Sequence, residues 1–300
     1  MDDNLSETVM KKPKQTRRHE DLDLFARVFQ VFADTPWLHY GLWLEGEEPR
    51  MTALRGAQER YVDKLLALLP PAPAHVLDIG GGTGALTAEL VQRGYRVDML
   101  TPSPVQVEIA RERLTDRATI HCTRFEDLDT AMKFDVCLFS ESFQYIPLDE
   151  GLGRAEALLA HDGRIIIADC FRTPAYKADR ALGGKRVGGG HPFAALGPAV
   201  DAAGLRVISD EDVTPLAAPT IALDRRVYRE VVAPVVADLG AALTRRSRIL
   251  GGLVGLLYRL TVSKRERANI DRRLAAEGRT PEDFMRYNTY RFMVLGRAKG

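Results

Sequence analysis

The segment at residues 76–84, Val-Leu-Asp-Ile-Gly-Gly-Gly-Thr-Gly, constrains the fold of this chain more than any other. It has the pattern of an apolar strand that ends in the carboxylate of Asp78 and a glycine loop, and the helix-forming residues 85–90 follow directly. Glycine lets a backbone turn sharply and approach a ligand closely, and the start of a helix presents N–H groups without partners. We therefore predict a strand, loop and helix that bind a nucleoside cofactor through Gly80, Gly82 and Gly84.

The charge of Asp78 discriminates between two kinds of cofactor. Gly80, Gly82 and Ala85 match the dinucleotide spacing G-x-G-x-x-G/A, and Asp98 stands where an acid would bind a ribose, so an NAD(P)-dependent oxidoreductase is one interpretation. A pyrophosphate at this helix start would lie beside Asp78, whose negative charge opposes it. S-adenosylmethionine has no phosphate and carries an amino group and a sulfonium, which a carboxylate stabilises. Asp78 therefore favours S-adenosylmethionine.

Composition narrows the class of protein. The chain has 300 residues, enough for one large α/β domain with additions or for two small domains. Its 42 Lys and Arg against 41 Asp and Glu leave a formal charge of +1, without the basic excess of a nucleic-acid binder, so we expect no nucleic-acid partner. The three cysteines lack C-x-x-C spacing and an even count, so we expect Cys122, Cys137 and Cys170 to be small buried residues in a reducing cytoplasm.

Two segments are candidates for a signal peptide or a transmembrane helix, and neither has the required apolar length. Residues 1–20 are polar and mixed in charge, with no apolar signal core, and we expect a disordered tail there. The most apolar late stretch, residues 249–260, is well short of the roughly 20 residues that cross a bilayer. We therefore expect a soluble protein with no transmembrane segment.

Strand-like runs alternate with helical ones from residue 75 to residue 170, which is the pattern of a parallel sheet wrapped by helices. We predict an α/β fold with a Rossmann-like, doubly wound sheet of seven strands, the last of them antiparallel. The predicted strands are residues 75–79, 96–101, 118–122, 134–140, 164–170, 205–211 and 290–297. The helices between them include 85–93, 104–114 with Ser103 as N-cap, and 155–160, which ends at the turn His161-Asp162-Gly163.

About 75 residues separate the last two predicted strands, too many for a plain connection. They carry an apolar stripe at helical spacing, and Thr280-Pro281-Glu282 has the signature of another helix start. We expect a helical lid over the substrate, although helices that only cover the edge of the sheet fit the same pattern. The stripe comprises Val227, Val231, Val235, Leu239, Ile249, Leu253, Leu256 and Leu260. The expected organisation is a tail at 1–20, an N-terminal helical cap at 21–72, a core at 73–212, the lid at 213–288 and a final strand at 289–300.

The chain resembles the class I S-adenosylmethionine-dependent methyltransferases over about residues 35–210 and the last strand. Residues 101–106, Thr-Pro-Ser-Pro-Val-Gln, are similar to the T-x-S-x-x-Q variant of tocopherol methyltransferases, cyclopropane fatty acid synthases and plant alkaloid N-methyltransferases. Residues 37–43, Trp-Leu-His-Tyr-Gly-Leu-Trp, are similar to the H-x-G-aromatic segment of the tocopherol enzymes. Residues 141–147, Glu-Ser-Phe-Gln-Tyr-Ile-Pro, resemble their E-S-G-E-H-M-P. Gln144 and Tyr145 depart from that pattern, so its carboxylate–imidazole pair is missing.

The resemblance implies roles for several residues. Thr101 and Gln106 are expected to bind the cofactor at its ribose, and Phe125 to stack on or flank the adenine. His39, with Tyr40 and Trp43, is expected to fold over the cofactor as an N-terminal flap, or instead to pack in the core as part of an aromatic helix. Arg124 stands where an acid often meets the adenine amine, and Glu126 or Asp127 could substitute for that acid. Ser140 is also expected at the cofactor, because ligands sit beyond the carboxyl ends of parallel strands.

Methyl transfer from S-adenosylmethionine requires little general acid–base catalysis by the protein. It is an in-line displacement at an activated carbon, so positioning in a dry site supplies much of the rate, and a base is needed only where the acceptor must lose a proton. We expect Tyr145 and Glu141 to orient the acceptor, or instead to make hydrogen bonds that cap their loop. His191 closes the glycine-rich loop 183–190 and is expected either to act as a base or to begin a helix. Cys, His, Asp and Glu show no metal-site spacing, so we expect no metal.

The expected function is that of a cytoplasmic methyltransferase of secondary metabolism that uses S-adenosylmethionine. The apolar stripe of the lid suggests a small, largely apolar acceptor such as a lipid, isoprenoid, polyketide or alkaloid-like metabolite, and leaves open whether carbon, nitrogen or oxygen is methylated. A homodimer is also left open. Two alternatives remain: the oxidoreductase that Asp98 supports, and a non-catalytic module that kept the cofactor pocket, which Gln144 and Tyr145 motivate.

Overall fold

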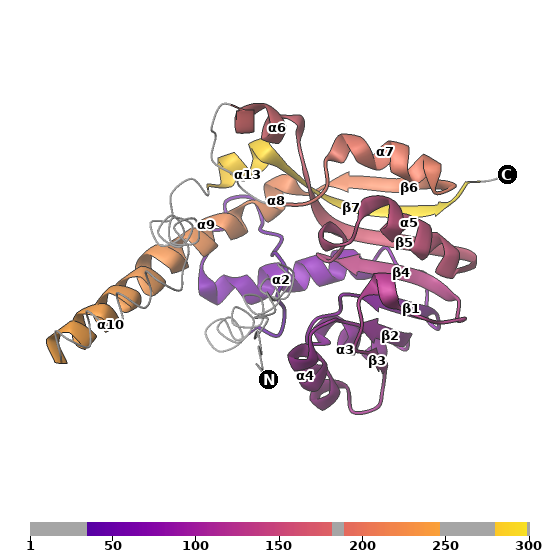
Figure 1. Cartoon of the computed structure of the whole chain (residues 1–300), viewed down its shortest axis with the longest axis horizontal. Helices are drawn as coiled ribbons and strands as arrows, with labels where there is room; N and C mark the ends of the chain where they lie inside the picture. The colour runs from indigo at the N-terminus through magenta and orange to yellow at the C-terminus, as the bar shows by residue number, and fades with distance from the viewer. Residues whose placement is uncertain (1–34, 182–188, 247–279, 299–300) are drawn as a thin grey trace, which may run out of the picture.

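One seven-stranded sheet forms the centre of the molecule (Figure 1). The computed structural model describes residues 35–181, 189–246 and 280–298. The strands follow the spatial order β3-β2-β1-β4-β5-β7-β6. They are β1 His75–Ile79, β2 Arg96–Leu100, β3 Thr119–His121, β4 Phe134–Ser140, β5 Leu159–Arg172, β6 Leu205–Asp212 and β7 Asn288–Arg297. Strand β7 pairs antiparallel with both β5 and β6, whereas the pairs among β1 to β5 are parallel. The predicted seven-stranded sheet with an antiparallel last strand is confirmed.

The central strands β1, β4 and β5 are mostly buried on both faces because helices cover both, whereas the edge strand β6 is exposed. Alternate residues of β1 point to opposite sides, so Val76 joins one buried cluster and Leu77 the other. Residues of α2 (Met51–Leu66) and α3 (Ala85–Gln92) pack into the first cluster, and those of α5 (Leu148–Leu158) and α7 (Phe193–Ala202) pack into the second. Helix α4 (Pro104–Leu114) packs on α3, and its predicted N-cap is confirmed, because the Ser103 hydroxyl accepts a hydrogen bond from the Gln106 N–H.

Three predicted features differ from the structure. The turn expected at His161–Gly163 lies inside β5, where the pairing with β4 shifts between Phe134 and Val136; the extra residues form an irregularity within the strand rather than its start. Cys122, expected to be buried, is exposed because it follows the short strand β3, whereas Cys137 and Cys170 are buried. The expected helical cap includes α2, but residues 35–50 before it form no helix. We call residues 36–43 the flap.

The region predicted as a lid is helical where the structure describes it. It contains α8 (Thr214–Ala217), α9 (Pro219–Val227), the π-helix η3 (Tyr228–Val232), α10 (Ala233–Arg246) and α13 (Pro281–Tyr287), and Thr280 caps α13 as predicted. Helix α10 extends away from the sheet (Figure 1). Val231 and Val235 of the apolar stripe are about half exposed. Ile249, Leu253, Leu256 and Leu260 lie outside the described residues, as does the predicted tail at 1–20.

The first lid helices are attached to the flap. The Thr220 hydroxyl of α9 accepts hydrogen bonds from the Gly41 N–H at 3.2 Å and from Trp43 Nε1 at 2.9 Å. Trp43 is buried with Leu223 and residues of α2. The flap is thus held between α2 and α9, over the carboxyl end of the sheet.

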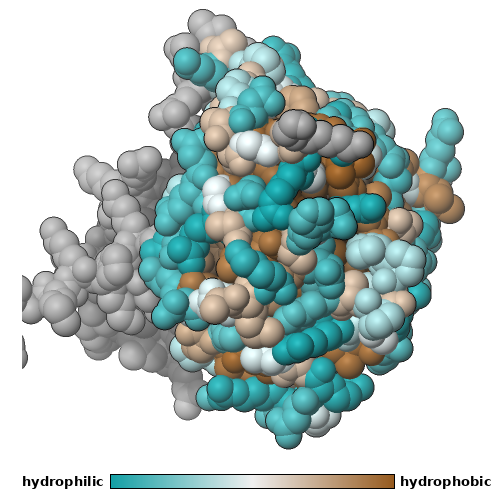
Figure 2. All heavy atoms as spheres, turned by 90° about the vertical axis from the view of Figure 1, so that its right-hand side faces the viewer, coloured by the Kyte–Doolittle hydropathy of each residue, from teal (hydrophilic) through white to brown (hydrophobic). Residues whose placement is uncertain are grey.

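The opposite end of the sheet faces the viewer in Figure 2, and its surface is mostly hydrophilic, with hydrophobic residues showing between polar ones. The remaining elements are α6 (Pro174–Ala181) and the single-turn helices η1 (Phe125–Asp127) and η2 (Phe143–Tyr145). Among the described residues, no helix is long and apolar enough to span a bilayer.

Candidate active site

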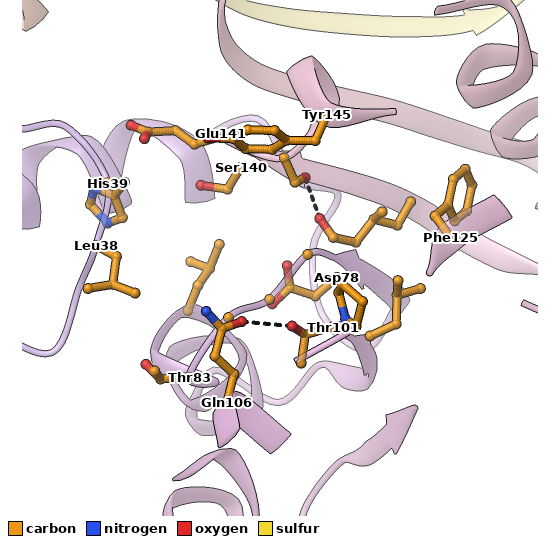
Figure 3. Close-up of a pocket in the computed structure, with 18 of the residues that line it drawn as sticks. Leu38, His39, Asp78, Thr83, Thr101, Gln106, Phe125, Ser140, Glu141 and Tyr145 are labelled. Carbon is orange, nitrogen blue, oxygen red and sulfur yellow. Dashed lines mark hydrogen bonds between the residues drawn. The ribbon is translucent and has the colours of Figure 1, made fainter. Parts of the chain in front are cut away.

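A cavity of about 270 Å³ opens at the carboxyl ends of β1, β2 and β4 (Figure 3). Its walls come from the flap, the loop after β1, the end of β2, the η1 turn and the end of β4. The lining residues are 36–39, 78–83, 85–86, 100–102, 106, 124–126, 140–142 and 145–146. The cavity therefore lies where ligands bind in parallel α/β sheets.

The glycine loop forms the floor of the cavity. The N–H groups of Gly80 and Gly81 both donate to the Leu100 carbonyl, at 2.9 and 3.1 Å, which holds the loop against the end of β2. Gly80 and Gly82 have φ of +79° and +58°, a region that side-chain-bearing residues rarely adopt. A Cβ on Gly82 would come within 4 Å of the Gly80 carbonyl oxygen alone, so the loop leaves open space above itself.

Asp78 lies beneath this loop and is almost completely buried. Its Oδ2 accepts a 2.7 Å hydrogen bond from the Thr87 hydroxyl of α3. Burial raises the pKa of the Asp78 carboxyl to about 6, and the Thr87 hydrogen bond partly opposes this by favouring the ionised form. A cation bound in the cavity would favour that form further.

The opposite half of the floor comes from β2 and η1. The Thr101 hydroxyl donates to Gln106 Oε1 at 2.7 Å, so the two residues of the T-x-S-x-x-Q segment lie side by side on the cavity wall (Figure 3). Phe125 is buried and packs edge-on against Phe139 at 5.6 Å. Arg124 bonds to Glu126, and both line the cavity beside Phe125. Asp127 does not line it.

Glu141 begins the turn after β4 with a positive φ of +57° and is held by the flap and the last strand. Its Oε1 accepts hydrogen bonds from the Tyr40 N–H at 2.6 Å and from the Tyr290 hydroxyl at 2.8 Å. The Tyr290 hydroxyl is 3.3 Å from that of Tyr61, which is 3.0 Å from Ser140 Oγ. Burial, and secondarily the charge of Asp169, raise the pKa of the Glu141 carboxyl to about 8.

A second buried carboxylate supports the same turn from below. Asp169 accepts hydrogen bonds from the N–H and the side-chain amide of Gln144, each at 3.0 Å, and from the Cys170 N–H at 2.7 Å. Burial raises the pKa of the Asp169 carboxyl to about 7. These bonds fix η2, which presents Tyr145 at the cavity with 47 % of its surface exposed.

The flap closes the remaining side of the cavity with Pro36, Trp37, Leu38 and His39. The His39 ring stacks on Tyr61 at a centroid distance of 4.0 Å, and its Nδ1 lies 2.8 Å from the Tyr40 carbonyl oxygen. Burial lowers the pKa of His39 to about 4.

Most of the residues predicted to bind cofactor are brought together: Asp78, Gly80, Gly82, Thr101, Gln106, Phe125, Glu126 and Ser140 all line the cavity. Tyr40 and Gly84 do not. The Tyr40 ring packs on Phe284 and Tyr290 instead, at 5.6 and 5.4 Å. A Cβ on Gly84 would lie 3.1 Å from Ala110 and from Leu114, so this glycine permits α3 to pack against α4.

Of the three residues predicted for catalysis, Glu141 and Tyr145 line the cavity and His191 does not. His191 Nε2 lies 3.1 Å from the Phe143 carbonyl oxygen, and its ring packs edge-on against Phe143. Residues 183–188 of its loop lie outside the described part of the chain. The placement matches a hydrogen bond that supports η2.

Asp98, the residue on which the dinucleotide interpretation depended, is not at the cavity. It lies in the middle of β2 opposite Leu77, with only 2 % of its surface exposed. Its two oxygens are bonded to His75 Nε2 at 2.7 Å and His121 Nε2 at 2.9 Å. Both oxygens of the Asp98 carboxylate therefore bind histidines of the neighbouring strands β1 and β3, and the carboxylate cannot reach a ribose in the cavity.

The contributors to the site that sequence patterns missed include Trp37 and Leu38 of the wall, Tyr61 and Tyr290 behind Glu141, and Asp169 below η2. Of these, only Trp37 and Leu38 carried a signal, because they begin the H-x-G-aromatic segment. In the described ranges, no cluster of three or more His, Cys, Asp or Glu could hold a metal ion.

Comparison with known proteins places this arrangement in context. Residues 76–163 match a methyltransferase domain family. An uncharacterised methyltransferase of Staphylococcus carnosus is 31 % identical over 40 % of this chain and 58 % of that protein. A ubiquinone biosynthesis O-methyltransferase of Xanthomonas axonopodis pv. citri is 29 % identical over 58 % of this chain and 71 % of its own length. The chain spans 58 % and 49 % of the first two curated relatives it matches.

Solved structures share the whole fold at low identity. A mycolic acid cyclopropane synthase bound to S-adenosylhomocysteine has a TM-score of 0.67 at 18 % identity, with 96 % of this chain and 99 % of the other covered. Geranyl diphosphate C-methyltransferase from Streptomyces coelicolor A3(2) has a TM-score of 0.58 at 16 % identity, covering 92 % and 98 %. A 4+2 cyclase has a TM-score of 0.65 at 18 % identity, covering 96 % and 98 %. At these identities the likenesses show a shared fold alone.

Proposed function

We propose that the chain is a class I S-adenosylmethionine-dependent methyltransferase, which transfers the methyl group of S-adenosylmethionine to a small, largely apolar acceptor. One observation carries the proposal: the cavity combines a side-chain-free glycine floor, the buried carboxyl of Asp78 and the Thr101–Gln106 pair at the carboxyl ends of adjacent strands.

The residues present fit the cofactor. The open space above Gly82 lets a ligand lie directly against the backbone of the loop, and Asp78 beneath the loop provides a carboxylate that can pair with an amino group. Thr101 and Gln106 would hold the ribose hydroxyls, and Phe125 and Glu126 would flank the adenine. When bound, the cofactor supplies a methyl group activated by its sulfonium.

The acceptor would be positioned by the part of the cavity wall not assigned to the cofactor, which includes Leu38, His39 and Tyr145. Leu38 and the ring of Tyr145 are apolar surfaces and are partly exposed at the cavity mouth. They suit a lipid, isoprenoid, polyketide or alkaloid-like metabolite, a class consistent with the geranyl diphosphate and mycolic acid named for structural neighbours. Free thiols at Cys122, Cys137 and Cys170 are consistent with a cytoplasmic enzyme.

Glu141 has a positioning role in this proposal. Its Oε1 is occupied by Tyr40 and Tyr290, and in Figure 3 its carboxyl points away from Asp78 and Thr101, toward the flap. In this proposal Glu141 closes the cavity by holding the flap, and Tyr145, which lines the cavity, contacts the acceptor.

A module that binds S-adenosylmethionine without transferring its methyl group is the second candidate, favoured by Gln144, whose amide is tied to Asp169 rather than directed to the cavity. Calorimetric titration with S-adenosylhomocysteine and incubation with methyl-labelled S-adenosylmethionine and a panel of apolar metabolites separate the two. Label transfer supports the enzyme, binding without transfer across the panel supports the module, and absence of binding rejects both. A change in nicotinamide absorbance on adding NAD(P)H would instead revive the oxidoreductase.

A further inference from the structure

Two flap residues that line the cavity each have a buried polar atom with no hydrogen-bond partner within the described parts of the chain. These atoms are Trp37 Nε1, a donor, and His39 Nε2. Both residues line the cavity, and Trp37 is only 7 % exposed. Buried polar groups are rarely left unpaired, because they lose hydration without gaining a bond, so this pair points to a ligand group.

The hydrogen bonding of His39 decides what its free nitrogen can do. Nδ1 lies 2.8 Å from the Tyr40 carbonyl oxygen, which only accepts, so Nδ1 carries the proton. With the pKa of the ring lowered to about 4, His39 is neutral near pH 7 and Nε2 is an acceptor. The ring is fixed by its stacking on Tyr61, and the backbone by a 2.6 Å hydrogen bond from Gln58 Nε2 to the His39 carbonyl.

The second tryptophan of the flap provides an internal contrast. Trp43 Nε1 donates to Thr220 Oγ1 at 2.9 Å, away from the cavity. The indole N–H of Trp43 therefore has a hydrogen-bond partner within the protein. The indole N–H of Trp37, six residues earlier in the same segment, has none among the described residues.

We propose that Trp37 Nε1–H and His39 Nε2 together bind a hydroxyl group of the methyl acceptor, an inference that rests on the function proposed above. A hydroxyl both accepts and donates, as this pair requires, and the two rings are neighbours in the flap, with their centroids 6.0 Å apart. The group is uncharged, because neither ring carries a charge to compensate one.

The geometry assigns this hydroxyl to the acceptor rather than to the cofactor. The residues proposed to bind the nucleoside lie in or directly after β1, β2 and η1, whereas Trp37 and His39 line the cavity from the flap. Figure 3 shows His39 on the side of Ser140 and Glu141, away from Phe125. The pair therefore selects apolar molecules that carry a hydroxyl over those that lack it.

Three matched probes test the proposal on the intact protein: 4-methylphenol, which donates and accepts, 4-methylanisole, which only accepts, and toluene, which does neither. The protein is labelled with ¹⁵N and saturated with S-adenosylhomocysteine before each probe is added. The two indole N–H signals are assigned with Trp43→Phe. We expect 4-methylphenol to shift both the Trp37 indole N–H and the His39 Nε2 signal, 4-methylanisole to shift only the former in the direction of a hydrogen bond, and toluene neither.

The matched variants are Trp37→Phe, which removes the donor, and His39→Asn, whose amide can still donate to the Tyr40 carbonyl but has no group at the Nε2 position. The wild type should bind 4-methylphenol about tenfold more tightly than toluene, and each variant should lose most of that preference while still binding S-adenosylhomocysteine. Trp43→Phe should keep it.

The proposal is overturned if S-adenosylhomocysteine alone produces both shifts, because the pair then serves the cofactor. It is also overturned if 4-methylphenol and toluene bind equally, or if 4-methylphenol at millimolar concentration does not bind. Failure to bind S-adenosylhomocysteine is a different result, which rejects the proposed function itself.

Discussion

The backbone N–H of Tyr40 donates a 2.6 Å hydrogen bond to Oε1 of Glu141, across 101 residues of sequence. The same oxygen accepts the Tyr290 hydroxyl, so one carboxyl group joins the flap, the turn after β4 and the last strand. Because the group is buried, its protonation is coupled to the stability of all three.

Replacing Glu141 by Gln should flatten the dependence of stability on pH. The folded-state pKa of about 8 lies above the ordinary value of 4.5, so between these values the folded protein holds a proton that the unfolded chain has lost. Stability from this group is therefore greatest below about pH 4.5 and falls as the pH rises toward 8. Glutamine keeps the oxygen that accepts both hydrogen bonds but does not ionise.

Thermal unfolding of the wild type and Glu141→Gln near pH 5.5 and near pH 8.5 provides the measurement. The melting temperature of the wild type should fall more between the two conditions than that of the variant. Asp169 and Asp78 act in the same direction and remain in both proteins, so only the difference between the two slopes reports on Glu141. Equal slopes would contradict the assigned position of its proton.

Gly82→Val should weaken binding of S-adenosylhomocysteine strongly. A valine side chain would enter the open space above the loop, and φ of +58° is unfavourable for a β-branched residue. The matched control is Gly46→Val, outside the cavity, at a glycine with φ of +75° where an added Cβ would have no atom within 4 Å. Isothermal calorimetry should show weaker binding of S-adenosylhomocysteine for Gly82→Val and not for Gly46→Val. If both variants lost a similar amount of affinity, the cause would be backbone strain rather than loss of the space above the loop.

Asp78→Asn should also weaken S-adenosylhomocysteine binding, by about 2 kcal/mol or about 30-fold in Kd, because an amide cannot pair its charge with the ligand amine. Asp63→Asn, on the exposed side of α2, is the surface control and should leave Kd unchanged. Undiminished affinity in Asp78→Asn would remove the electrostatic basis of the cofactor assignment.

Thr87→Val tests the same carboxylate through its neighbour. The Thr87 hydroxyl favours ionised Asp78, whose pKa is about 6, so removing the hydroxyl should raise that pKa further. S-adenosylhomocysteine binding should weaken as the pH falls through about 6 in the wild type, and this decline should begin at higher pH in the variant. A pH profile of Kd that does not move would show that Asp78 is not the titrating group.

The sequence predicted the sheet well because its strands are apolar runs bounded by glycine, proline and polar residues. Residues 75–79 and 134–140 match β1 and β4 in full. The beginning of β5 was missed because His161-Asp162-Gly163 has the composition of a turn, and only the pairing with β4 reveals a strand irregularity there. Turn-forming residues alone cannot distinguish the two.

The floor of the site was predictable for a similar reason, since Asp78, the glycines and Thr101 are local motifs. The contacts of Glu141 were not, because Tyr40 and Tyr290 lie 101 and 149 residues away, and neither carries a local signal of the contact. Gly84 was assigned to the cofactor by its motif, but the structure requires glycine there because α4 packs closely against this position. A short sequence pattern does not contain that packing contact.

Asp98→Asn should separate the two cofactor interpretations by affecting stability and not binding. The Asp98 carboxylate is buried between His75 and His121, each bonded to a different oxygen, and in asparagine one of these two oxygens is replaced by an NH2 group, which cannot accept from an imidazole N–H. We expect urea unfolding to show a loss of about 2 kcal/mol, because one buried hydrogen bond to a charged group is not replaced. Affinity for S-adenosylhomocysteine should stay within error of the wild type, since Thr101, directly after β2, lines the cavity and Asp98 does not. A large loss of affinity at unchanged stability would return Asp98 to the ribose and reopen the dinucleotide interpretation.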